Sequence, residues 1–162
     1  MLAVLPYASL DPTLIQLGPF HGEKARLFYQ GFEDVVLLTP PLRFLQYDPV
    51  PSRILFDTGD QRAFAAKVTA VQDRIESLLP KTGCPLLHLA NPRTLALFTP
   101  STTTLQKHDG TLVPLQLPPG TLVRCAIRLT SVYHHPSNTY RIQHSIVKLW
   151  AVTETPWPLR AP

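Results

Sequence analysis

The sequence predicts a mainly β fold that contains one helix. Proline is abundant, with 18 residues among 162, while only 16% of the residues are charged and 44% are hydrophobic. Because proline inside a helix costs about 3 kcal/mol, this composition argues against a helical bundle and a coiled coil. The hydrophobic fraction is also too high for a disordered chain. The class of protein left by these exclusions is a β-rich one, with prolines between its strands and a chain long enough to bury a hydrophobic core.

Short strands are expected first. Alternating or continuous apolar runs occupy residues 25–30, 35–38, 42–47 and 53–57. Turn residues separate these runs, among them Gly31 and the Thr39-Pro40-Pro41 step. Runs of this length between glycine and proline turns are typical of β-strands.

The period then changes, and a helix is expected over about residues 60–79. Its apolar positions follow the 4-3-4-3 spacing of one helix face: Phe64, Val68, Val71, Ile75, Leu78 and Leu79. Thr58 or Asp60 is expected to cap its start, and Pro80 to end it.

The remaining chain again favours strands. A short one is expected at 95–98, a hairpin at 104–117 with Asp109-Gly110 as its turn, and two long strands at 121–134 and 139–152. Five or more strands with one helix between them predict a small OB-like β-barrel, with a β-sandwich as the alternative. We expect a single domain over 1–162, with a folded core of about 18–153 between proline-rich ends.

Compartment signals are few. The N-terminus lacks the basic segment of a signal peptide, and no apolar run is long enough to span a bilayer. Cys84 and Cys125 are expected to be free thiols, with Cys125 buried in a strand. These features predict a soluble intracellular protein that uses no cofactor.

Positive charge is concentrated near the C-terminus. Residues 90–153 contain six Lys and Arg and one acid, Asp109, a local excess of 6 − 1 = +5, against +4 for the whole chain. In the strand 121–134, Arg124 and Arg128 lie opposite the apolar face formed by odd-numbered positions. In strand 139–152, apolar and polar residues do not alternate regularly between the two faces. A β-bulge near Ser145, which adds one residue to the strand, would explain this irregularity.

A positive β surface with aromatic rings is what single-strand nucleic-acid binding requires, because cations neutralise phosphates and rings stack on bases. Arginine also suits phosphate recognition. The predicted binding residues are Arg26, Phe28, Arg43, Arg124, Arg128, Tyr133, Tyr140, Arg141, Lys148 and Trp150. The competing interpretation is ordinary: strand aromatics pack in a core, and strand arginines lie on a solvated face.

Two patterns invite an enzymatic interpretation. Ile54-Leu55-Phe56-Asp57-Thr58-Gly59 is similar to the active-site segment of retroviral-type aspartic proteases, in which carboxylates from two copies share a proton. Asp60 departs from that pattern, no glycine-rich flap follows, and a strand end with a helix cap is the alternative. His134, His135 and His144 have no metal-ligand spacing with Cys125, so no metal site is predicted.

Three features in order resemble the single-stranded DNA-binding-like OB-fold proteins of large eukaryotic DNA viruses. They are Gly22-Glu23-Lys24 through Tyr29-Gln30-Gly31 to Leu38-Thr39-Pro40, the strand and helix of 53–79, and Leu117-Pro118-Pro119-Gly120-Thr121 to Trp150-Ala151-Val152. Together these cover most of residues 18–153. The resemblance implies single-strand binding in viral DNA replication, recombination or repair. Many such binders end in an acidic tail, whereas residues 155–162 of this sequence are neutral to basic, a departure from the resemblance.

The sequence therefore predicts a non-enzymatic protein that binds single-stranded DNA or RNA and has no membrane partner. A structural or interaction protein of a virion or assembly complex is the alternative, with homo-oligomers or replication and assembly proteins as partners. A dimeric aspartic protease using Asp57 is the third hypothesis.

Overall fold

A computed structural model describes residues 3–49, 52–91, 93–99, 104–107, 110–114 and 117–152. Its elements in chain order are β1 (Ala3–Pro6), the 3-10 helices η1 (Tyr7–Ser9) and η2 (Pro12–Leu14), β2 (Ile15–His21), β3 (Lys24–Tyr29), β4 (Phe32–Glu33), β5 (Val35–Leu38), β6 (Leu42–Pro49), β7 (Ser52–Asp57), α1 (Arg62–Leu78), β8 (Leu86–Leu87), β9 (Thr94–Phe98), β10 (Thr104–Gln106), β11 (Leu112–Pro114), β12 (Leu122–His135) and β13 (Thr139–Ala151). The mainly β class with one α-helix is thus confirmed in the described residues.

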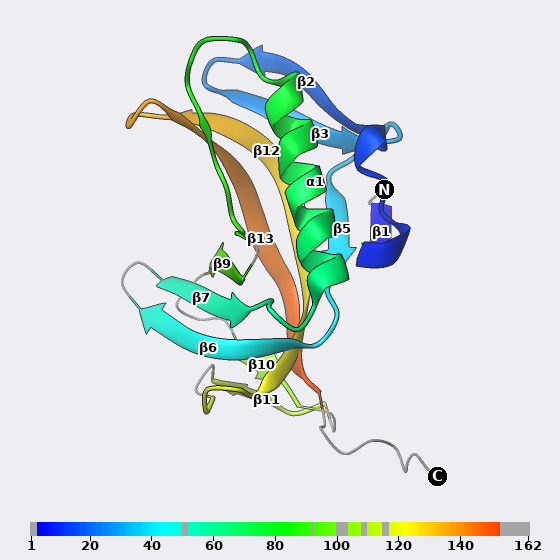
Figure 1. Cartoon of the computed structure of the whole chain (residues 1–162), viewed down its shortest axis with the longest axis vertical. Coiled ribbons are helices and arrows are strands. Elements are labelled where there is room, and N and C mark those ends of the chain that lie inside the picture. The colour runs from blue at the N-terminus through cyan, green and yellow to red at the C-terminus, as the bar shows by residue number, and fades with distance from the viewer. Residues whose placement is uncertain are drawn as a thin grey trace.

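The long hairpin of β12 and β13 organises the sheet (Figure 1). One edge of β12 pairs with β13 along almost its whole length. Its other edge is shared by three strands in turn: β6 at residues 122–123, β5 at 126–129 and β3 at 131–133. The sheet therefore branches along β12, and the β10–β11 hairpin joins it at the far end from β2 and β3 (Figure 1).

The expected OB-like barrel is not formed, and an open or sandwich-like sheet fits better. From β12 the sheet continues through β6 and β7 to β9, which curls back toward β13. Closure would need a backbone ladder between β9 and β13. Instead, the Phe98 N–H donates to the side-chain Nε2 of His144, at 3.0 Å. Among the described strands, a side chain thus stands where a closed barrel would have strand pairing.

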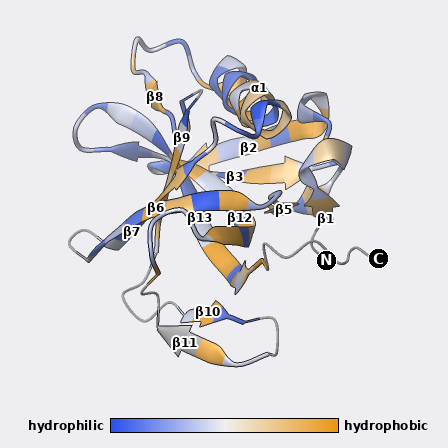
Figure 2. Cartoon of the chain, turned by 60° about the horizontal axis from the view of Figure 1, so that its bottom comes forward, coloured by the Kyte–Doolittle hydropathy of each residue, from blue (hydrophilic) through white to orange (hydrophobic). Residues whose placement is uncertain are grey.

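Helix α1 covers one face of this sheet and forms the core with it. Phe64, Val68, Val71 and Ile75 are buried, as the spacing predicted, and the chain leaves the helix at Pro80. The expected side-chain cap is absent from the described residues: Gln61 is the N-cap and makes no capping hydrogen bond. Figure 2 shows hydrophobic and hydrophilic residues alternating along α1, as an amphipathic helix requires.

The core extends further toward the N-terminus than expected. Leu10 and Ile15, which precede residue 18, are each 1% exposed and belong to the main hydrophobic cluster. Lys67 and Arg74 of α1 fasten this segment by donating to the carbonyls of Leu10 and Ile15. The proline-rich tail after residue 152 and the Asp109 turn position lie outside the described residues.

Within the part of the chain described here, no helix combines the length and apolar character needed to cross a membrane.

Candidate nucleic-acid interface

The register of β12 and β13 places most of the predicted binding residues on one face. Arg124 lies opposite Trp150, and Tyr133 lies opposite Arg141. Residues directly opposite each other in an antiparallel pair project from the same face. The other face bears buried pairs such as Cys125 with Leu149 and faces the core. We call the face without these core residues the outer face; it includes Arg124, Arg128, Tyr133, Arg141, Lys148 and Trp150.

Two β-bulges make this alignment possible. Leu129 pairs with His144 and Ser131 pairs with Gln143, so Thr130 is an extra residue in β12 and Tyr133 shares a face with Arg124. Lys148 pairs with Ala126 and Ile146 pairs with Ile127, so Val147 is an extra residue in β13. Val147 is 58% exposed, and beyond it the inward and outward parity of β13 is reversed. The bulge predicted near Ser145 is therefore present two residues later. Before the bulge, even-numbered residues of β13 such as Tyr140 and Ile142 face the core. After it, even-numbered residues such as Trp150 lie on the outer face.

The outer face continues onto the neighbouring strands. Arg26 of β3 lies opposite Ser131, and Phe28 follows on the same side of β3. The Phe28 ring is half-buried over Gly18, where an added Cβ would lie 3.0 Å from the ring. Arg43 of β6 lies opposite Leu122 at the other end of β12.

Tyr140 does not belong to the outer face, contrary to the prediction. It is only 6% exposed and lies in the core, with its ring 5.9 Å from that of Phe20 and 5.3 Å from that of His134. Its position opposite His134 in the register gives it the inward parity. Tyr140 is therefore unavailable for stacking on a base.

Three of the predicted arginines are neutralised by acids of this chain. Asp34 is 1% exposed, accepts from Arg128 Nε at 2.9 Å and Nη2 at 2.6 Å, and accepts from Arg26 Nη2 at 3.2 Å. Arg43 pairs with the exposed Asp60 at 3.1 Å. The positive charge of these arginines is partly cancelled before any ligand arrives.

Three other cations on the outer face have no ion pair among the described residues. Arg124 Nε donates to the backbone carbonyl of Thr39 at 3.3 Å. The Nε of Arg141 is buried without a hydrogen-bond partner. Lys148 Nζ lies 5.4 Å from the centroid of the Trp150 ring, a cation–π arrangement. These groups remain free to neutralise an external anion.

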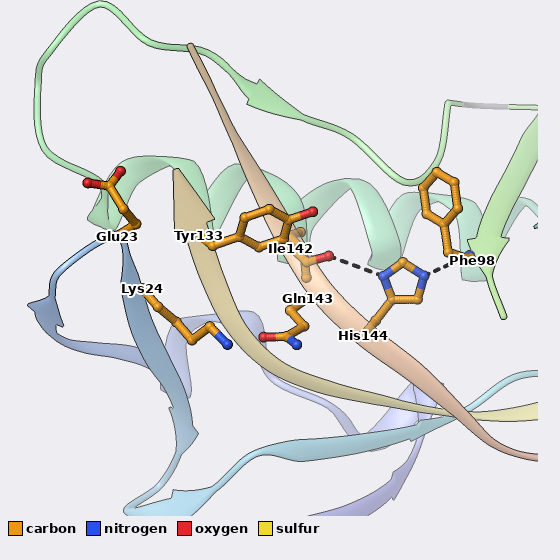
Figure 3. A pocket seen from close by; sticks show the side chains of 7 residues that line it. All are labelled: Glu23, Lys24, Phe98, Tyr133, Ile142, Gln143 and His144. Atoms are coloured by element: carbon orange, nitrogen blue, oxygen red, sulfur yellow. Dashed lines mark hydrogen bonds between the residues drawn. The ribbon is translucent and has the colours of Figure 1, made fainter. Parts of the chain in front are cut away.

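A hollow of about 450 Å³ adjoins Tyr133 (Figure 3). Its lining includes Lys24, Gln143, His144 and Phe98, none of which the sequence analysis selected. Lys24 lies opposite Tyr133 in the register between β3 and β12, so the two project from the same face. The alternation of side chains along a strand, which identified Arg124, could also have identified Gln143 as an outward-facing residue. The position of Lys24 could not have been predicted in this way, because no local pattern in the sequence indicates that β3 pairs with β12.

His144 borders this hollow as a neutral imidazole. Burial lowers its pKa, although a hydrogen bond to the carbonyl of Ile142 opposes that shift. The ring accepts the Phe98 N–H at Nε2, so its proton is placed on Nδ1, which donates to the Ile142 carbonyl at 3.1 Å. His144 therefore holds β9 against β13 and adds no positive charge to the outer face.

The segment similar to aspartic proteases spans the end of β7 and the start of the turn that leads to α1. Asp57 Oδ1 accepts the Gly59 N–H at 2.7 Å, and Thr58 is buried. The carboxylate thus closes its own turn, which matches the alternative interpretation of a strand end leading into a helix.

One group among the described residues has the spacing for a metal ion. Ligand atoms of Asp73, Glu76 and His88 lie within 4.8 Å of one another, and all three residues are exposed. Exposed acidic groups of this kind are common without a metal. His134, His135 and His144 form no such group with Cys125 in the described part of the chain.

Comparison with models of known families, with curated proteins and with solved structures finds no match to this chain.

Proposed function

We propose that the outer face binds single-stranded nucleic acid. Arg124, Arg141 and Lys148 would neutralise backbone phosphates, while Trp150 and Tyr133 would offer surfaces on which bases stack. One observation supports this most: three cations that have no ion pair with any described residue share a face of one hairpin with two partly exposed aromatic rings. Replication, recombination or repair of viral DNA remains the setting that the sequence resemblance implies.

The spacing of these groups suits an extended strand. Trp150 and Arg124 lie at one end of the hairpin, and Tyr133 and Arg141 at the other. Nine residues of β-strand from 124 to 133 span about 30 Å. That length accommodates several unstacked nucleotides, and the two aromatic rings would engage bases near its ends.

Oligo-dT binding at several salt concentrations, followed by fluorescence anisotropy, tests the proposal. The variant with Arg124, Arg141 and Lys148 replaced by alanine should bind weakly, and its salt slope should fall by about 2, since each phosphate contact on a single strand contributes about 0.7. A matched control replaces the exposed Arg62, Lys81 and Arg93, which lie on α1 or in loops outside the β12–β13 hairpin. Equal effects of both triple variants, or wild-type binding that ignores salt, would refute the proposal. An oligo-U arm distinguishes RNA from DNA.

An interaction role is the second candidate, and the internal pairing of Asp34 favours it. Arg26 and Arg128 also lie on the outer face, yet both already contact a buried acid of the same chain. A surface with less net charge is better suited to a protein partner than to a phosphate backbone. Light scattering that detects a stable oligomer, together with no oligo-dT binding, would support this role.

A further inference from the structure

Three side chains form a chain of contacts at the end of the molecule where β12 turns into β13. Glu23 Oε2 lies 3.0 Å from His134 Nδ1, and His134 Nε2 lies 3.8 Å from Cys84 Sγ. The order of thiol, imidazole and carboxylate is the one by which cysteine nucleophiles are activated on unrelated folds. This group lies on the core-facing side of β12, separate from the outer face.

Backbone pairing holds the three residues together although they are far apart in sequence. The His134 N–H donates to the Glu23 carbonyl at 2.8 Å, where the β2–β3 turn meets β12. The Tyr140 N–H donates to the Pro85 carbonyl at 2.8 Å and places the segment before β8 beside β13. Cys84 immediately precedes Pro85, so its thiol is held next to His134.

Asn138 completes the geometry. It lies in the β12–β13 turn with φ of 65°, a conformation that asparagine tolerates better than most residues. Its Oδ1 accepts the S–H of the neutral Cys84 thiol at 3.1 Å and lies 3.1 Å from His134 Nε2. An N–H on Nε2 of a protonated His134 is thereby directed toward both the amide oxygen and the sulfur.

The groups around this centre favour a thiolate beside an imidazolium. A hydrogen bond with Thr82, followed by one with His134, lowers the pKa of Cys84. Contact with Cys84, then with Glu23 and Asn138, raises the pKa of His134, and the Tyr140 ring packs against the imidazole. Cys125 provides a contrast, because complete burial raises the pKa of its thiol. One of the two cysteines is thus set up to react, and the other is not.

We propose that Cys84 is the nucleophile of an acyl-transfer centre for activated carboxyl derivatives, with His134 as its acid and base and Glu23 as a positioning residue. The thiolate attacks the carbonyl carbon of an ester, and a C–S bond forms as the carbonyl electrons move to oxygen. Collapse of this intermediate breaks the ester C–O bond, and the leaving alcohol takes the proton of His134 Nε2. Neutral His134 then removes a proton from water, and the resulting hydroxide attacks the thioester. The carboxylic acid is released, and the thiolate and imidazolium are restored.

This activity goes beyond the proposed nucleic-acid binding and uses none of its residues. Its test has two stages on the full chain. First, the rate of alkylation by iodoacetamide is measured against pH, and the modified peptide is identified by mass spectrometry. Cys84 should react and Cys125 should not, with a midpoint below that of free cysteine. Second, p-nitrophenyl acetate should release p-nitrophenol and leave an acetyl group on Cys84.

The neighbouring histidines provide a matched pair of variants. His134→Ala should move the alkylation midpoint to higher pH and slow acylation by at least about tenfold, because it removes the acid and base. His135→Ala should change neither, since the His135 side chain hydrogen-bonds with Ser137 in the adjacent turn and contacts none of Cys84, His134 and Glu23 among the described interactions. Glu23→Gln, at a side chain 74% exposed, keeps the fold while weakening the hold on His134, so the midpoint should rise.

Three results would overturn the proposal. One is alkylation of Cys84 no faster than that of free cysteine near neutral pH. Another is equal behaviour of His134→Ala and His135→Ala when both unfold at the wild-type temperature. The third is rapid alkylation without any acetyl adduct on Cys84, which would leave a reactive thiol but no acyl transfer. Cys84→Ser, which should lose both reactions, shows that the signals arise at this sulfur.

Discussion

Replacing Asp34 by asparagine should destabilise the protein and strengthen its binding to nucleic acid. Asp34 has φ of 63°, which asparagine also tolerates, so the change removes charge with little backbone strain. Its buried carboxylate contacts Arg26 and Arg128, whose side chains are 50% and 39% exposed. These arginines can regain water, so the loss lies below the ~3–5 kcal/mol typical of a broken buried pair. We expect a loss of about 2 kcal/mol, since hydrogen bonds to charged groups contribute about 1.5–3 kcal/mol.

The same substitution releases positive charge on the outer face. Arg26 and Arg128 would become available to phosphates, and each new contact should steepen the salt dependence of oligo-dT binding by about 0.7. Affinity at low salt should rise although stability falls. A purely structural defect would lower both quantities.

Asp73→Asn is the matched control for this experiment. It makes the same change in net charge, but Asp73 is exposed on α1 and pairs with no arginine of the outer face among the described residues, so we expect a loss below about 1 kcal/mol. Urea unfolding measures the two stabilities, and anisotropy measures the two affinities. The reasoning is refuted if Asp34→Asn costs less than Asp73→Asn, or if both variants bind oligo-dT equally well.

Three further predictions concern the core and the sheet. Gln72→Leu should cost about 2–3 kcal/mol in urea unfolding, because its buried Oε1 accepts the N–H groups of Leu89 and Ala90, at 2.6 and 3.1 Å, and these donors would be left unpaired. Phe64→Ala should cost about 3–5 kcal/mol by the same measurement, since the ring is fully buried; a loss under ~1 kcal/mol would contradict the packing of α1. Burial lowers the pKa of His144, so its contribution to stability should be complete above about pH 6.5 and decline as the pH falls below that value. In His144→Gln, the free energy of unfolding should fall less between about pH 6.5 and lower pH than it does in the wild type. An unchanged pH dependence of that free energy would count against the role of the neutral ring.

The strands and the helix could largely be predicted because they depend on local pattern. The expected strand at 35–38 matches β5, and the helix expected over 60–79 matches α1 within two residues at its start. Their signals are the continuous apolar run and the 4-3-4-3 spacing, both of which lie within a short window of sequence. The N-terminal strand β2 was missed because Gly18 and Pro19 interrupt its alternation.

The candidate site was only partly predictable because its electrostatics depend on long-range pairing. Asp34 lies next to β5 in sequence, whereas Arg128 lies 94 residues away, and only the antiparallel pairing of β5 with β12 brings them together. The same limit applies to Cys84 and His134, which are 50 residues apart and meet because β8 pairs with β13. A charge count along the chain detects an excess of arginine but not which arginines are already neutralised.

The +5 excess of charge in residues 90–153 therefore matters only through two properties of each cation: the face of the sheet on which it lies, and whether an acid of the same chain already pairs with it. The bulge at Val147 determines the face: if residue 147 took a regular place in the strand, Lys148 and Trp150 would both share the inward parity of Ile142. Asp34 determines the pairing, because it withdraws Arg128 from the cations of β12 while leaving Arg124 free of any ion pair among the described residues. Arg124→Ala should consequently weaken oligo-dT binding more than Arg128→Ala does, since Arg124 has no ion pair among the described residues while the charge of Arg128 is already neutralised by Asp34. The opposite order of the two affinities, measured for variants that remain folded by circular dichroism, would place the binding surface around Asp34 and not along the Arg124 end of the hairpin.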